Sequence, residues 1–243
     1  MLKRSITKQA ATLGVFFSII TLMSLASVRA DLAWSDHFND EDTIFNNTTI
    51  NTPDNVITLL TEVNENNFGD FDNGTSNDLF SYENGLTGNQ SQYLEISFDQ
   101  ISDDASDFLE LRIEFDTPVE NLSLSVLDVD EGPDTGLFVP SGTPGFVDLV
   151  EVFVNDINVR TNPSWFTTGP GVVLDDEAEA DGFEGDAQVG DTSTDGNVDI
   201  DFGSLQVDSI TVTYRSSDDA SGNPSDQAIG ISGLVYDTVD VAA

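Results

Sequence analysis

The segment LELRIEFD, residues 109–116, alternates between apolar and polar side chains at every position. On an extended chain its apolar residues share one face, and its glutamates and arginine share the other. A period of two with one polar face predicts an antiparallel sheet with one side on the core and one side in water. The same alternation recurs in residues 197–202 and 208–215.

The rest of the chain after residue 30 shows short runs of this kind between turn residues, and no convincing amphipathic helix. The runs predict an all-β fold, an antiparallel β-sandwich of jelly-roll type. Two long irregular segments, residues 64–92 and 162–196, are predicted to be loops, which in a compact domain are usually functional or mobile. The predicted strands are residues 56–63, 93–99, 109–116, 121–130, 147–155, 197–202, 208–215 and 228–236.

The N-terminus has the pattern of a signal peptide, which we assign to residues 1–30, with a single domain in residues 31–243. Basic residues precede an apolar run, and the run ends at a small-residue cleavage pattern that includes Ala30. An uncleaved anchor is the alternative, because the run approaches the roughly 18 residues that span a bilayer. We therefore expect a secreted or cell-surface protein without membrane contact after cleavage, and the absence of cysteine excludes disulfides.

All 45 acidic side chains lie after residue 30, where Arg112, Arg160 and Arg215 are the only basic residues besides one histidine. Nucleic-acid binding is excluded, because phosphate contacts need clusters of lysine or arginine. Divalent cations are the expected ionic partners. The alternative is a solvated acidic surface suited to high salt, in a structural matrix protein with no specific ligand.

The segment VLDVDEGPD, residues 126–134, is the first candidate metal site. Counted from the two leucines before it, Asp128 and Asp130 fall on the core-facing side of their strand. Because an unpaired buried carboxylate costs several kcal/mol, a bulge, backbone amides or a hard cation must offset it. We predict Ca²⁺, with Asp134 and Asp148 at the same end. A strand that ends in a solvated acidic turn is the alternative.

A second calcium candidate is DTSTDGNVD, residues 191–199. Asp191, Asp195 and Asp199 occupy positions one, five and nine of an EF-hand-like loop, with glycine at position six. Position twelve is Phe202 where a bidentate glutamate is expected, so an ordinary Asp-Gly turn is the alternative. Residues 70–78 are a weaker third candidate, rich in oxygen side chains.

Aromatic residues in the predicted loops form the candidate ligand-binding site. Trp165 and Phe166 are flanked by polar residues, and Tyr82 lies in the other long loop. An aromatic face can stack on a sugar ring while neighbouring polar groups bind its hydroxyls, which predicts a glycan or an extracellular matrix component as partner. The alternative is that Trp165 caps the hydrophobic core.

Catalysis finds little support in the sequence. His37 is the only histidine, cysteine is absent, and no nucleophile-elbow, phosphate-loop or metalloprotease motif occurs. We therefore expect a non-enzymatic protein. A polysaccharide-degrading enzyme is the least favoured alternative, since a glycosidase needs only two carboxylates.

Residues 115–130 match the phrase F-x-x-P-V-x-N-[FL]-S-[FL]-x-[IVL]-x-D-[IV]-D, and residues 210–214 and 229–234 supply matching closing strands. This pattern resembles a domain of secreted bacterial surface proteins, including many with PEP-CTERM sorting tails. The resemblance covers residues 93–236 and implies an extracellular jelly-roll domain of adhesive or matrix-associated type without enzymatic activity. It marks Asp128 and Asp130 as the acids of the motif.

Overall fold

The computed structural model describes residues 28–64, 79–85, 87–98, 107–132, 144–175, 181–190, 192–220 and 227–239. Strands hold 58% and helices 4% of these residues, and every strand pair among them is antiparallel. The predicted all-β antiparallel class is therefore confirmed. The elements are β1 (Val28–Leu32), η1 (Trp34–Asp36), β2 (Thr48–Asn51), β3 (Val56–Asn64), β4 (Phe80–Glu83), β5 (Tyr93–Phe98), β6 (Phe108–Leu127), β7 (Glu131–Gly132), β8 (Phe146–Val154), β9 (Ile157–Asn158), η2 (Val159–Thr161), β10 (Phe166–Thr168), β11 (Val172–Leu174), β12 (Phe183–Gly185), β13 (Val198–Asp201), β14 (Val207–Ser216), β15 (Gln227–Ile231) and β16 (Leu234–Thr238).

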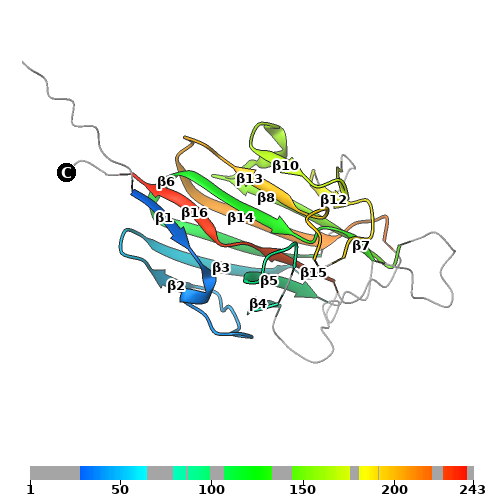
Figure 1. Cartoon of the computed structure of the whole chain (residues 1–243), viewed down its shortest axis with the longest axis horizontal. Coiled ribbons are helices and arrows are strands. Elements are labelled where there is room, and N and C mark those ends of the chain that lie inside the picture. Colours follow the sequence, from blue (N-terminus) through cyan, green and yellow to red (C-terminus); the bar gives the residue numbers. More distant parts are fainter. Residues whose placement is uncertain are drawn as a thin grey trace, which may run out of the picture.

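The 20-residue strand β6 connects two groups of strands. Its first half pairs with β3 and β14, and this group continues through β8, β12 and β11. Its second half pairs with β13 on one side and β16 on the other, which gives the order β10, β13, β6, β16, β1. Figure 1 shows β1, β3, β14 and β16 lying along nearly the same axis across the molecule, with β1 antiparallel to β16.

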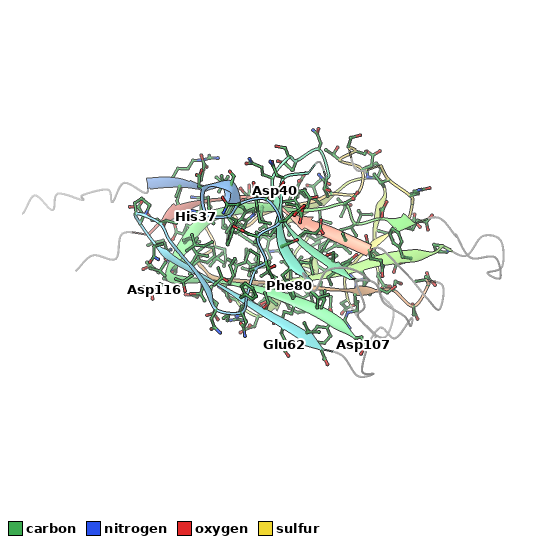
Figure 2. All side chains as sticks on the ribbon, turned by 90° about the horizontal axis from the view of Figure 1, so that it is seen from below. His37, Asp40, Glu62, Phe80, Asp107 and Asp116 are labelled. Carbon is green, nitrogen blue, oxygen red and sulfur yellow. The ribbon has the colours of Figure 1, made fainter. Side chains whose placement is uncertain are left out.

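The sequence predicted two strands where β6 is continuous, because Pro118 stands between them and proline usually interrupts a sheet. At this point the side chain of Asn55 replaces a neighbouring strand. Its Oδ1 accepts a hydrogen bond from the Thr117 amide at 3.2 Å, and its Nδ2 donates to the Thr117 carbonyl at 2.7 Å. Figure 2 labels Asp107 and Asp116, just before and within β6, and shows them far apart along the molecule.

A bulge at Asn121 decides which side chains of β6 face the core. Asn121 has a φ of 50°, and the pairing with β16 shifts by one residue at this point. Buried residues fall on odd positions before the bulge, from Leu109 to Phe115, and on even positions after it, from Leu122 to Val126. Both halves thereby turn their apolar faces into one hydrophobic cluster.

Several expected boundaries change in the structure. The predicted loop 162–196 contains β10, β11 and β12, three-residue strands too short to show an alternating pattern. The predicted strand 228–236 is two strands, β15 and β16, because Ser232 and Gly233 interrupt it. Part of the predicted loop 64–92 is β4, and much of the remainder lies outside the described residues.

The expected signal peptide lies outside the described residues up to residue 27. Residues 28–32, of which three were assigned to that peptide, form β1 and pair with β16 from Val28↔Thr238 to Leu32↔Leu234. No helix in the described part of the chain is long and apolar enough to cross a membrane.

We predict that Asn121→Val lowers the free energy of unfolding by about 1–3 kcal/mol, because a β-branched residue is strained at positive φ. Chemical denaturation followed by fluorescence measures this change. Asn121→Gly is the matched control, because both variants lose the 2.8 Å hydrogen bond from Asn121 to Asp237, whereas only glycine accepts the backbone conformation. Equal losses in the two variants would contradict the role of the bulge.

Candidate functional site

An open groove of about 740 Å³ crosses the second group of strands. Residues from β10, β13, β6, β16 and β1 line it, so the groove runs across five adjacent strands. The connection between β4 and β5 and the segment at η1 also border it. The groove is therefore a feature of the sheet's outward face, bordered by loops.

Strand register sets the polar floor of the groove. In one row Asp201 of β13 lies opposite Ser123 of β6, which lies opposite Val235 of β16 and then Asp31 of β1. In the next row Asp199 lies between Ser125 and Thr167. These side chains are exposed or half-buried, whereas their strand neighbours Leu124 and Ile200 are buried. The floor thus carries hydroxyls and carboxylates above an apolar layer.

Trp165 and Phe166 line the groove at its β10 side. Both are half-buried, and each packs edge-on against a core ring, Trp165 on Phe202 at 5.7 Å and Phe166 on Phe183 at 5.0 Å between centroids. The sequence analysis gave Trp165 two alternative roles, a ligand contact or a cap on the hydrophobic core. In the structure Trp165 both packs against the core and lines the groove. An aromatic side chain held in this way loses little further freedom when a ligand packs on it.

Asp199 is held in place within the floor. The Ser125 hydroxyl donates a 2.6 Å hydrogen bond to Asp199 Oδ1, which is in the range of a charge-assisted bond. A second hollow of about 390 Å³ adjoins the groove and shares Ser123, Asp201 and Val235 with it. Arg29 lines that second hollow.

The structure brings Asp128, Asp130 and Asp148 together at the end of β6, apart from the groove. Asp128 has a φ of 64°, so the chain turns there and Asp128 is only half-buried, whereas Asp130 is 8% and Asp148 1% exposed. The Val189 amide donates to Asp130 Oδ2 at 3.0 Å. The sequence analysis expected the cost of burying these acids to be offset by a bulge, by backbone amides or by a cation. The structure shows a left-handed residue at Asp128 and a backbone amide on Asp130.

Hydrogen-bond donors surround the carboxyl group of Asp148. The Tyr214 hydroxyl donates to Oδ1 at 2.5 Å, the Gln227 amide donates to Oδ1 at 3.3 Å, and the Asp130 amide donates to Oδ2 at 3.2 Å. Burial raises the pKa of Asp148 well above its usual value, and the neighbouring Asp130 carboxylate raises it further. The hydrogen bonds from Tyr214 and the Asp130 amide act in the opposite direction and lower this pKa.

Calcium takes six to eight oxygen ligands. In the described part of the chain, no three His, Cys, Asp or Glu side chains are grouped so as to hold a metal ion. The described partners of the Asp148 carboxyl group are the hydrogen-bond donors of Tyr214, Gln227 and the Asp130 amide. Asp134 lies outside the described residues, as do Asp191 and the candidate segment 70–78.

The described residues of the EF-hand-like loop point to different partners. Asn197 is buried, and its Nδ2 donates to the Gly88 carbonyl at 2.9 Å. Asp199 belongs to β13 and bonds Ser125 in the groove, while Asp195 is exposed in the preceding turn. The described part of the segment is a turn that leads into β13, and the calcium loop stays a prediction from the sequence.

Tyr82 does not lie where the sequence analysis expected it. It is part of β4, is 2% exposed and stacks on Phe38 with ring centroids 6.3 Å apart. Burial raises the pKa of its hydroxyl. Tyr82 is a core residue rather than a loop contact, because the loop assigned to residues 64–92 contains this strand.

The single histidine, His37, is exposed directly after η1, and Figure 2 labels it on the outside of the molecule. No hydrogen bond or ion pair in the described residues links it to a serine and an aspartate. The geometry of a Ser-His-Asp triad, which requires a nucleophile and a carboxylate on opposite sides of the ring, is not formed there.

Comparison with protein-family models, with curated proteins and with solved structures found no match for this chain. The resemblance to domains of PEP-CTERM-type exported proteins thus stays a prediction from the sequence.

The sequence analysis did not single out Asp31, Ser123, Ser125, Thr167 or Asp201. Their signal was present as the polar face of alternating strands, which marks outward positions without saying which strands are adjacent. The order β10, β13, β6, β16, β1 supplies that information, because it joins residues up to about 200 positions apart in the chain.

We predict that the protein melts at a higher temperature at pH 5 than at pH 8. Burial raises the pKa of Glu184 to about 7, with Asp175 adding to the shift, and raises the pKa of Glu95 to about 6. An acid with a raised pKa in the folded state stabilises the fold below its unfolded value, and this contribution is lost as pH rises through the folded value. Thermal melting across this range at constant ionic strength measures the effect.

The double variant Glu95→Gln with Glu184→Gln tests whether these two glutamates cause the pH dependence of the melting temperature. It removes both titrating groups and retains their hydrogen-bonding shape, so the melting temperature becomes less dependent on pH between 5 and 8. A wild-type protein that is more stable at pH 8 than at pH 5 would contradict the raised values.

Proposed function

We propose that this protein is an exported, non-enzymatic glycan-binding protein that holds its ligand in the groove across β10, β13, β6, β16 and β1. The observation that carries the proposal is the combination of a polar floor with the anchored aromatic residues Trp165 and Phe166 in one open groove. An extracellular matrix polysaccharide is the kind of partner that this surface fits.

The chemistry of the floor suits a sugar better than an apolar ligand. Serine and threonine hydroxyls both donate and accept hydrogen bonds, and carboxylates accept them, so Ser123, Ser125, Thr167, Asp199 and Asp201 match the mixed demands of sugar hydroxyls. Trp165 adds an apolar contact for the face of a ring. The carboxylates disfavour uronate or sulfate groups through repulsion.

The finer fold and location belong to the same proposal. We interpret the two groups of strands that share β6 as the two layers of a jelly-roll β-sandwich, since their apolar faces contribute to one core. Secretion to the medium or cell surface follows from the signal-like sequence of residues 1–30. The protein then meets glycans outside the cell.

Two rival functions make different predictions for the groove. A structural acidic matrix protein would use its surface charge collectively, so no single groove residue would affect ligand binding. A polysaccharide-degrading enzyme would show turnover that depends on two carboxylates. Substitution in the groove, together with an assay for released reducing ends, therefore separates the three functions.

We predict that Trp165→Ala weakens binding to the preferred glycan of a polysaccharide panel by about tenfold or more, because it removes the apolar contact. Affinity electrophoresis and isothermal titration calorimetry measure the loss. Phe45→Ala is the matched control, since Phe45 is 70% exposed and does not line the groove. Melting temperatures verify that Trp165→Ala still folds after losing its contact with Phe202.

Unchanged binding by a folded Trp165→Ala protein would contradict the proposed groove. Binding that falls equally in Phe45→Ala would point to a collective surface effect instead. Absence of binding by the wild-type protein across neutral, acidic and amino-sugar polysaccharides would overturn the function itself.

Calcium stabilisation is a separate proposal, supported by the excess of carboxylates and by the acids at the end of β6. Binding to the folded form alone stabilises it by RT ln(1 + [L]/Kd), about 2.7 kcal/mol at a hundredfold excess over Kd. We predict that millimolar Ca²⁺ raises the melting temperature above its value in EDTA. NaCl at matched ionic strength is the control, and an equal rise in NaCl would assign the effect to screening.

A further inference from the structure

The described lining of the groove carries negative charge near both of its borders. Asp31 lies at one border, and Asp199 and Asp201 lie near the other, while the described lining contains no lysine or arginine. The three arginines after residue 30 pair with carboxylates elsewhere: Arg112 with Glu114 and Asp156, Arg160 with Asp181, and Arg215 with Glu151. No described cation therefore neutralises the groove from within.

Among the described residues, Arg29 is the one basic side chain that lines the adjoining hollow. Its guanidinium is 3.7 Å from Asp31, and both side chains are more than 70% exposed. An ion pair with this exposure contributes little. Arg29 shares the adjoining hollow with Asp201, but no lysine or arginine of the described residues lines the groove beside Asp199.

The acids of the floor are ordered rather than scattered. Asp199 and Asp201 point outward two residues apart on one strand, about 7 Å along it, and Asp31 lies three strands away from Asp201, about 14 Å across the sheet. The bond from Ser125 fixes Asp199, and the Gly203 amide donates to Asp201 at 2.8 Å. A ligand that complements this floor is elongated and carries several positive charges.

We infer that the groove binds a chain of amino sugars with free ammonium groups, such as a deacetylated glucosamine polymer. This inference rests on the proposed glycan-binding function and adds the charge of the ligand to it. Ammonium groups pair with the carboxylates of Asp31, Asp199 and Asp201, ring hydroxyls bond the serines and Thr167, and a ring face packs on Trp165.

The overall negative charge of the protein, formally −38, attracts any polycation, so the test must separate the groove from the surface. Glucosamine hexamer and N-acetylglucosamine hexamer form a matched pair, because acetylation removes the charge and retains the sugar chain. Titration calorimetry at pH 6 in low salt compares their affinities. We expect the glucosamine hexamer to bind about tenfold or more tightly, with an advantage that shrinks in 0.5 M NaCl.

The variant Asp199→Asn with Asp201→Asn tests the location, because asparagine retains the Oδ1 acceptors for Ser125 and Gly203. It should lose most of the preference for the charged hexamer. Asp54→Asn with Asp208→Asn removes the same charge at exposed positions outside the groove, and it should keep the preference.

The outcomes distinguish the inference from the function on which it rests. Binding of a neutral oligosaccharide that needs Trp165, without preference for the charged hexamer, would overturn the amino-sugar inference alone. A preference that both double variants lose equally would assign it to the general surface and also overturn the inference. Binding of no glycan at all would overturn both.

Discussion

A left-handed residue in the middle of a long strand is the constraint on which the structure depends. Without the bulge at Asn121, one half of β6 would turn its leucines to water, because side chains alternate along a strand. With it, Leu111 and Leu124 reach the same core although they stand an odd number of residues apart. Asn55 completes the backbone pairing near Thr117, where the two groups of strands diverge. The groove exists because the second half of β6 then presents its serines outward.

The described carboxylates include three contrasting physical situations. Asp148 is buried and satisfied by donors from Tyr214, Gln227 and the Asp130 backbone. Others pair with the few arginines, as Glu151 does with Arg215. The acids of the groove floor, Asp31, Asp199 and Asp201, are exposed and stand in register across strands. This last set combines access with an ordered arrangement, which is why we assign the glycan ligand to it, whereas the acids at the end of β6 belong to the separate calcium proposal.

Alternation along the chain was enough to predict the class of fold and several strands, as for residues 208–215 within β14. It misassigned Tyr82, because a four-residue strand inside a polar segment carries too little periodicity to recognise. The sequence analysis divided β6 into two strands around Pro118. The hydrogen bonds from Asn55, which pair the backbone beside this proline, come from a residue 62 positions away and leave no local signal in the sequence. The groove becomes visible only when the order of the strands is known. Of its lining residues, the sequence analysis singled out Trp165 and Phe166 as ligand contacts and Asp199 as a calcium ligand.

The pairing of β1 with β16 has a mechanical consequence. The strands are antiparallel, with Val28 opposite Thr238, so the first and last strands of the described chain have their outer ends side by side. A tensile load applied between those ends acts on the hydrogen bonds one rung after another, rather than on the whole ladder at once. Asp31 sits near the far end of that ladder, while the Trp34 indole bonds the carbonyls of Ile231 and Ser232 beyond it. Under tension the backbone pairing of β1 with β16 would break first at Val28 and Thr238 and proceed toward Leu32 and Leu234. The hydrogen bonds of the Trp34 indole would break last.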